Sequence, residues 1–153
     1  MLVKRILFIV LFSIDLLLTN GCSKDDILEP QEDHFEAEGM VFYSSGIKLA
    51  EIFRGVTSDT LRAKVGLLSE HMEIKFLNPE RQEIDPPDYK KQPLAWEIAD
   101  TSIVSIKQHE GKEGSYEFHL WGKKEGVTKI EFFILHEGHP DFRSGKIPIK
   151  VEN

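Results

Sequence analysis

The residue types best suited to chemistry lie near the C-terminal end, where two histidines flank a Glu-Gly pair. The chain has six histidines, and this pair consists of His136 and His139, with Asp141 two residues further on. A turn at Glu-Gly would bring two imidazoles within reach of one cation, and the aspartate could add an oxygen ligand. Imidazole with carboxylate suits zinc or another divalent transition metal, including copper. The alternative interpretation is that these are solvated loop histidines, or histidines that cap backbone carbonyls.

Strand direction predicts a third imidazole at the same place. If the strand that ends near residue 108 is followed by three strands of alternating direction, the loops 109–114 and 137–145 share one end of the fold. His109 opens the first of these loops. The sequence therefore predicts a metal site formed by His109, His136, His139 and Asp141.

An acidic loop at residues 78–93 is expected to join this end of the fold. Because loops held on a rigid scaffold often carry recognition residues, it is a second candidate contact surface. His119 is expected on a strand face, and His71 near the opposite end of the fold. The loop carboxylates that could take part are Glu80, Glu83, Asp85 and Asp88.

No motif indicates catalysis or nucleic-acid binding. The sequence has no Gly-rich phosphate loop, G-x-S-x-G elbow, H-E-x-x-H helix or Asp-rich calcium loop. The formal net charge is −7, and because residues 1–21 carry +1, the remainder carries −8. An acidic surface without a basic stripe disfavours nucleic acid as a partner. We therefore expect a protein that is not an enzyme.

Period-two alternation of apolar and polar residues dominates from Phe35 onward and predicts an all-β fold. Many short strands with Gly-rich turns are typical of a β-sandwich, here of about seven to nine strands. Pro148 predicts an edge strand or a bulge in the last run. The strands are predicted near residues 38–43, 47–54, 60–67, 71–77, 94–98, 103–108, 115–121, 127–136 and 146–151. The side chains expected to be mostly buried are Trp96, Phe118, Leu120, Ile130, Phe132, Ile149 and Val151.

Residues 94–151 resemble the bacterial immunoglobulin-like domain. That family has a Trp-bearing strand, an Asp-x-Ser turn, a Val-bearing strand and a Gly-x-x-x-Gly-Thr-x-x-Ile run, and Val127 is inserted before the threonine here. The resemblance implies an immunoglobulin-like β-sandwich with a role in adhesion, spacing or binding at bacterial surfaces. The matching residues are Trp96, Asp100, Ser102, Val104, Gly122, Gly126, Thr128 and Ile130.

The N-terminal residues 1–21 have the pattern of a signal peptide. Lys4 and Arg5 form a charged start, and an apolar run follows that is too short to span a bilayer as a helix. Asp15 interrupts this run. The segment therefore predicts export rather than a permanent transmembrane helix.

The chain's only cysteine, Cys22, follows this segment directly. Together with Leu18 and Gly21 it resembles the lipobox of bacterial lipoproteins, although that family's leucine position is Thr19 here. The resemblance implies that Cys22 becomes the acylated first residue of the mature chain. The polar residues 22–34 then form an acidic tether, and their Ser-Lys-Asp-Asp start is similar to tags that send lipoproteins to the cell surface.

The sequence thus predicts a signal peptide at 1–21, a tether at 22–34 and a sandwich at 35–153. We expect a lipid-anchored protein of the outer membrane or cell surface with a non-catalytic binding or structural role toward a protein or surface ligand. One alternative is an envelope lipoprotein that binds zinc or copper. The other is an accessory subunit of an envelope complex.

Overall fold

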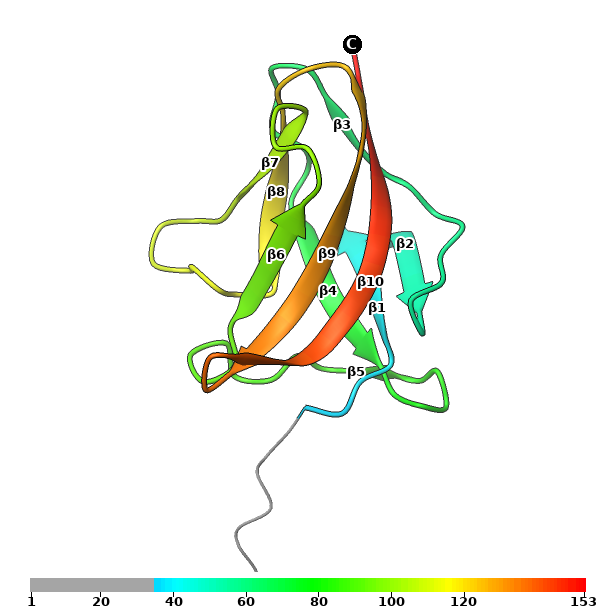
Figure 1. Cartoon of the computed structure of the whole chain (residues 1–153), viewed down its shortest axis with the longest axis vertical. Coiled ribbons are helices and arrows are strands. Elements are labelled where there is room, and N and C mark those ends of the chain that lie inside the picture. The colour runs from blue at the N-terminus through cyan, green and yellow to red at the C-terminus, as the bar shows by residue number, and fades with distance from the viewer. Residues whose placement is uncertain (1–34) are drawn as a thin grey trace, which may run out of the picture. The chain divides into compact units, whose positions relative to one another are not determined.

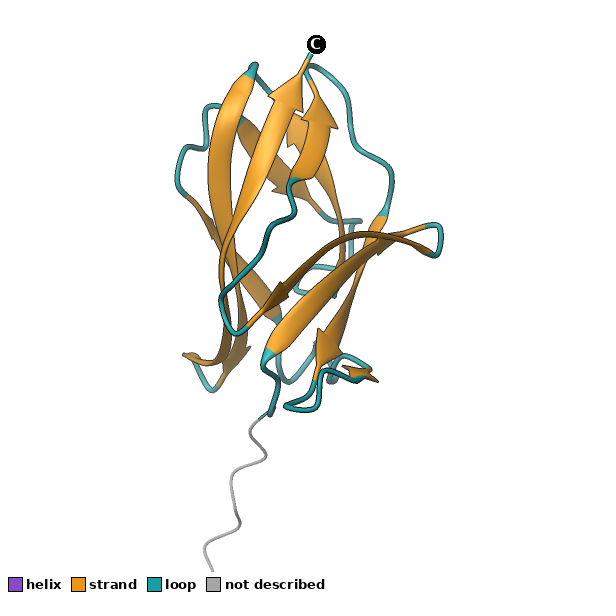
Figure 2. Cartoon of the chain, turned by 90° about the vertical axis from the view of Figure 1, so that its right-hand side faces the viewer, coloured by secondary structure: helices purple, strands orange, loops and turns teal. Residues whose placement is uncertain are grey.

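The computed structural model describes residues 35–153, so the predicted signal peptide, Cys22 and tether lie outside the described residues. The described part contains ten strands and no helix, arranged as two packed sheets (Figures 1 and 2). Among these residues no helix is long and apolar enough to cross a membrane. The predicted β-sandwich is confirmed, and the two-residue strand β5 accounts for the one strand beyond the predicted range.

The first sheet has the strand order β2-β1-β4-β8-β7, with β5 paired to β4. Strands β4 and β8 are antiparallel but strongly staggered, because only Met72 with Phe118 and Glu73 with Glu117 are paired. The start of β4 therefore lies beside the start of β8. The six strands are β1 (Gly39–Ser44), β2 (Ile47–Phe53), β4 (Met72–Leu77), β5 (Glu83–Ile84), β7 (Val104–Lys107) and β8 (Glu117–Gly122).

The second sheet has the order β3-β10-β9-β6, in which β3 (Leu61–Lys64) is parallel to β10. Strands β9 (Gly126–His136) and β10 (His139–Glu152) form a long hairpin, and β6 (Leu94–Ile98) pairs with β9.

The β9–β10 hairpin corrects the prediction of a loop at 137–145. Glu137 and Gly138 have φ angles of 50° and 87°, so these two residues alone make the turn. Positive φ at both central residues is typical of the tight turn that matches the twist of a hairpin. Strand β10 consequently begins at His139, with register irregularities between Pro140 and Phe142 and between Arg143 and Lys146.

Pro148 does not place its strand at an edge, because β10 lies between β3 and β9. Proline is tolerated here because the pairing with β3 begins one residue later, at Ile149 with Leu61. The missing N–H therefore costs no ladder hydrogen bond on that side.

The alternating apolar residues of both sheets meet in one core. The rings of Phe42, Phe118 and Phe132 pack together, with centroids of Phe118 and Phe132 5.4 Å apart. Six of the seven predicted core side chains are buried, whereas Trp96 is only partly buried. Trp96 lies on β6, an edge strand, and so only one neighbouring strand covers it.

The residues that resemble the immunoglobulin-like family have structural contacts. Asp100 accepts hydrogen bonds from the backbone N–H and hydroxyl of Ser102, which lower the pKa of its carboxyl. The N–H of Asp100 donates to the hydroxyl of Thr128, 2.9 Å away. A Cβ at Gly122 would lie 2.3 Å from the carbonyl oxygen of Lys64, so only glycine allows β8 to approach β3 this closely. These residues therefore support the fold.

Candidate functional site

The hairpin brings three of the four predicted metal ligands together. His136 and His139 are register partners across the turn, with ring centroids 6.2 Å apart. The Asp141 carboxylate lies against both rings: its oxygens are 3.2 Å from Nδ1 of His136 and 3.4 Å from Nδ1 of His139. Its side chain is only 2% exposed. We call these three residues the hairpin cluster.

His109 does not join the hairpin cluster, although its loop does reach the same end of the fold. Pro93 accepts a hydrogen bond from Leu135 at the end of β9, and Leu94 donates to Gly114 in the 109–114 loop. The ring contacts of His109 are with two other histidines. As the side chains stand, no group of three or more His, Cys, Asp or Glu residues within 35–153 could hold a metal ion. The structure thus brings His136, His139 and Asp141 together, whereas His109 lies beside two other histidines.

The structure instead gathers three imidazoles that the sequence did not group, and we call His71, His109 and His119 the three-histidine cluster. The ring centroids are 5.2 Å apart for His109 and His119, 5.3 Å for His71 and His119, and 5.8 Å for His71 and His109. Each histidine comes from a different part of the first sheet, so the cluster depends on long-range pairing.

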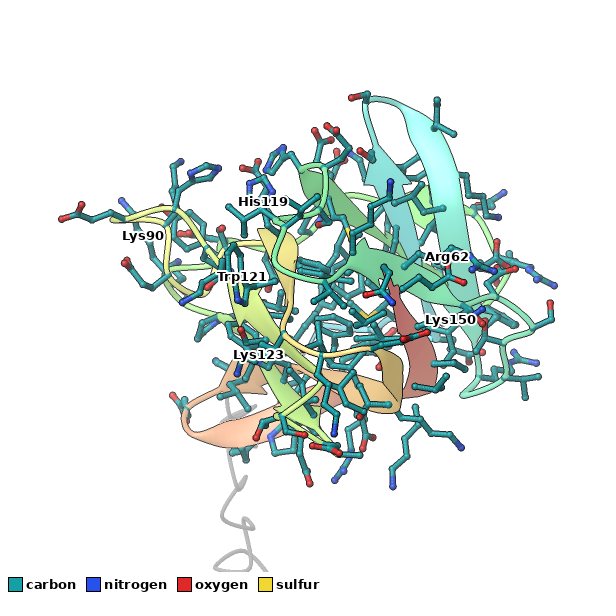
Figure 3. All side chains as sticks on the ribbon, turned by 90° about the horizontal axis from the view of Figure 1, so that it is seen from above. Arg62, Lys90, His119, Trp121, Lys123 and Lys150 are labelled. Carbon is teal, nitrogen blue, oxygen red and sulfur yellow. The ribbon has the colours of Figure 1, made fainter. Side chains whose placement is uncertain are left out.

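Register explains the gathering. His119 lies on β8 and pairs with Lys107 on β7. His109 follows Lys107 by two residues and therefore lies near His119. His71 directly precedes Met72, the residue that pairs with Phe118. The stagger of β4 against β8 therefore places His71 beside the other two, and not near the opposite end as predicted. His119 does lie on an outward strand face, as expected, together with Trp121 (Figure 3).

His119 is the best-fixed member of the cluster. Its Nδ1 lies 2.9 Å from the carbonyl oxygen of Ser69, and its Nε2 lies 3.4 Å from Nε2 of His109. Ser69 is itself tied to β8, because its N–H donates to the carbonyl of Leu120 and its hydroxyl accepts from the Leu120 N–H. The second nitrogen of His119 is thus directed at His109.

His71 brings an unsatisfied nitrogen to the cluster. Its Nε2 is buried from solvent and has no hydrogen-bond partner among the described residues. A carboxylate oxygen of Glu117 lies 3.5 Å from this nitrogen, and one of Glu73 lies 4.0 Å from Nδ1. The cluster therefore combines three imidazoles with two partly exposed carboxylates.

The acidic segment 78–93 is held on the first sheet by the pairing of β5 with β4, and two of its carboxylates also contact that sheet. Glu83 accepts a hydrogen bond from the Tyr43 hydroxyl and raises the pKa of that phenol. Asp85 pairs with Lys75 and raises the pKa of the ammonium group. These contacts give Glu83 and Asp85 structural partners.

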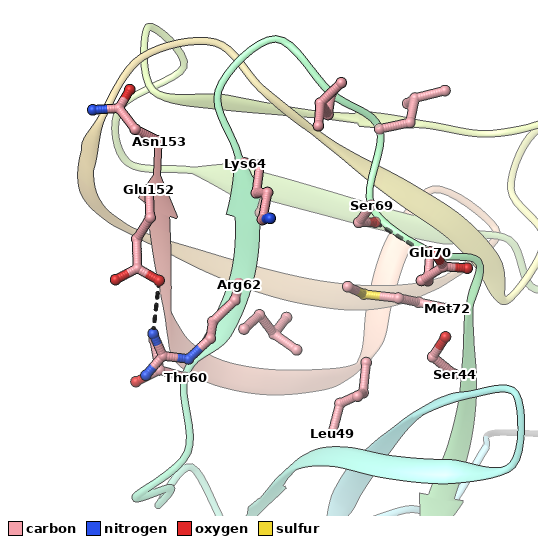
Figure 4. A pocket seen from close by; sticks show the side chains of 14 residues that line it. Ser44, Leu49, Thr60, Arg62, Lys64, Ser69, Glu70, Met72, Glu152 and Asn153 are labelled. Atoms are coloured by element: carbon pink, nitrogen blue, oxygen red, sulfur yellow. Dashed lines mark hydrogen bonds and ion pairs between the residues drawn. The ribbon is translucent and has the colours of Figure 1, made fainter.

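A second surface feature is an apolar groove of about 640 Å³ between the edge strands β2 and β3. Leu49, Leu67 and Leu68 line it and are 40%, 55% and 51% exposed. Figure 4 shows the groove with the ion pair between Arg62 and Glu152 at one side. Sequence alternation did not reveal it, because two of the leucines lie in the β3–β4 connection.

Comparison with solved structures finds similar chains. No protein-family model matches the chain, and no curated protein matches it. Among solved structures, it is similar to the crystal structure of the S-layer protein SbsC domains 4 and 5, with a TM-score of 0.42 and 13% sequence identity. The match covers 63% of this chain and 49% of that structure, so the chain spans about half the length of the S-layer fragment.

Proposed function

We propose that this chain is a lipid-anchored protein of the bacterial outer membrane or cell surface whose sandwich domain has a non-catalytic binding role. The observation that carries the proposal is the position of Cys22, the only cysteine, between a signal-like segment and a polar stretch. The first strand of the sandwich begins at Gly39, 17 residues after Cys22. Such a length of polar chain would let the domain stand off the lipid surface.

A binding role is supported by what the described surface offers. The three-histidine cluster combines an exposed His109 with partly buried His71 and His119. The groove between β2 and β3 exposes leucines that the core does not use. Imidazoles and apolar patches on a rigid sandwich serve recognition of a ligand.

The anchor is tested by replacing Cys22 in cells of a Gram-negative host. Wild-type chain should carry fatty-acyl label, and its mature N-terminus should be Cys22 by mass spectrometry. Cys22→Ala should carry no label and leave the outer-membrane fraction, whereas the matched control Ser23→Ala should behave like wild type. A wild-type chain that is unlabelled and fractionates as soluble would contradict the proposal.

The alternative role as an accessory subunit of an envelope complex has one observation in its favour. Leu68 forms an isolated β-bridge with Trp121, so the exposed leucines adjoin this half-buried tryptophan. Such a patch suits a protein partner. A partner that co-purifies with the wild-type chain should then be lost from the Leu67→Asp variant, whose fold should remain intact.

A further inference from the structure

We infer that His71, His109 and His119 form a binding site for a zinc-class divalent transition metal, with Glu117 next to it. This inference rests on the proposed binding role and names its ligand. It differs from the set predicted from sequence, because it uses His109 with two histidines that the sequence had placed elsewhere and leaves out the hairpin cluster.

The spacing of the rings fits coordination of one ion. Zinc–nitrogen bonds are about 2.0–2.1 Å long, so two nitrogens on a tetrahedral ion lie about 3.3–3.4 Å apart. The Nε2 atoms of His109 and His119 are 3.4 Å apart. An imidazole centre lies roughly 3.2 Å from an ion bound at Nε2, so three such centres lie about 5.2 Å from each other. The observed separations are 5.2, 5.3 and 5.8 Å.

The hydrogen bonds around His119 are those of a metal ligand. A ligating histidine generally donates its other ring N–H to a carboxylate or a backbone carbonyl, which fixes the tautomer and the ring orientation. With a proton on Nδ1, His119 would donate to the Ser69 carbonyl, and its Nε2, 3.4 Å from Nε2 of His109, would carry the lone pair that an ion needs. Ser69 is fixed by two hydrogen bonds to Leu120, so this arrangement exists before any ion arrives.

His71 is the member that must move. Its Nε2 has no hydrogen-bond partner among the described residues. Burying a polar atom without a partner costs folding free energy, and coordination of an ion by this nitrogen would offset that cost. The side chain is 38% exposed, so a change of rotamer meets little resistance. Because the three side chains do not form a finished site as they stand, binding of an ion requires this rotation.

The chemistry of the donors selects the class of metal. Three imidazoles and one carboxylate suit Zn²⁺, and they bind Cu²⁺ or Ni²⁺ as well, whereas Ca²⁺ and Mg²⁺ prefer sites made wholly of oxygen. Glu117 lies 3.5 Å from Nε2 of His71, where it can complete a fourth position or balance the charge of the ion. The hairpin cluster differs in that its carboxylate is almost fully buried, since Asp141 is 2% exposed and contacts both imidazoles.

The test is zinc titration of the full chain in detergent by calorimetry, with Cys22→Ala in every sample to remove the only thiol. Stripped of metal by a chelator, this background should bind one Zn²⁺ per chain. His71→Gln, His109→Gln and His119→Gln should each lower the affinity at least about 100-fold, since loss of an outer partner alone costs about 10–100-fold. Glu117→Gln should cost about tenfold.

The matched control is the double variant His136→Gln, His139→Gln, which should bind zinc as the background does. Co²⁺ in place of zinc should give the visible absorption of a tetrahedral nitrogen site, and His119→Gln should abolish it. The inference is overturned if the background binds no zinc at one-to-one stoichiometry, if the three single variants bind as well as the background, or if the control double variant alone loses binding. Because Cys22 is absent throughout, failure here leaves the anchoring proposal untouched.

Discussion

The two histidine clusters of this sandwich differ in how they are assembled and in what already satisfies them. In the hairpin cluster, a two-residue turn places His136 opposite His139, and the Asp141 carboxylate contacts both. In the three-histidine cluster, His71 lies just before β4, His109 just after β7 and His119 within β8, and two of the imidazoles approach each other by their Nε2 atoms.

The difference separates a structural cluster from one that is open to a ligand. Imidazoles whose nitrogens lie beside a buried carboxylate are stabilised within the protein itself. His71, by contrast, has as acidic neighbours among the described residues only the half-exposed carboxylates of Glu73 and Glu117, so its buried Nε2 gains by binding a ligand from outside. Substitutions in and beneath the two clusters test this contrast.

The first prediction removes the support beneath each cluster. Phe118, next to His119, is fully buried, and Phe142, next to Asp141, is 5% exposed with its ring 5.4 Å from that of Phe76. Phe118→Ala and Phe142→Ala should each lower the free energy of unfolding by about 3–5 kcal/mol in urea denaturation, because each leaves a cavity. A loss below about 1 kcal/mol for either would show that its ring is not part of the core.

The second prediction compares the carboxylates. Asp141→Ala should cost about 1–3 kcal/mol of folding stability, because its side chain is 2% exposed and two imidazoles contact it. Glu117→Ala should cost at most about 1 kcal/mol, since this side chain is 50% exposed and solvent screens it. Equal costs in thermal or urea unfolding would remove the distinction between the two clusters.

The third prediction concerns Tyr116, which directly precedes the strand that carries His119. Burial, reinforced by the charge of Asp88, raises the pKa of its phenol well above the usual value, and its hydroxyl donates to the Gln92 carbonyl. Above about pH 10 the unfolded chain loses this proton while the folded chain keeps it, so stability falls as the pH rises.

Tyr116→Phe should therefore cost about 0.5–1.5 kcal/mol at pH 7. It should also flatten the decline of the free energy of unfolding above pH 10, measured by urea denaturation at several pH values. An unchanged alkaline decline would mean that other groups cause it.

The fourth prediction has the smallest effect. In the absence of metal, the triple variant His71→Gln, His109→Gln, His119→Gln should change stability by no more than about 0.5 kcal/mol, because His109 is exposed, the other two are only partly buried, and glutamine keeps a polar side chain at each position. Added zinc should raise the melting temperature of the wild-type chain and leave that of the triple variant unchanged. If the triple variant were strongly destabilised without metal, the three histidines would have a structural role in the fold.

Much of the fold could be predicted because local patterns determine it. Period-two alternation located the strands, and six of the seven expected core side chains are buried. The exceptions have tertiary causes. Trp96 is half-buried because β6 is an edge strand, and Pro148 is tolerated inside a sheet because parallel pairing starts one residue later.

The hairpin cluster depends on local sequence, whereas the three-histidine cluster depends on the register between distant strands. The contact of His136 with His139 follows from a turn at two adjacent residues, which a sequence reveals. His71 lies beside His119 because β4 and β8 overlap at only two residue pairs. Alternation of apolar and polar residues indicates which face of a sheet a residue occupies, but not how far one strand is shifted along the next. Direction alone placed His71 at the wrong end.

Zinc binding by the three-histidine cluster can be seen in an anomalous difference map, recorded at the zinc absorption edge, from crystals grown with one equivalent of zinc. We expect one strong peak bounded by the ring nitrogens of His71, His109 and His119, at about 2.0–2.1 Å from each. A peak at His136, His139 and Asp141 instead, or no ordered zinc within the sandwich, would show that the three-histidine cluster is not the metal site.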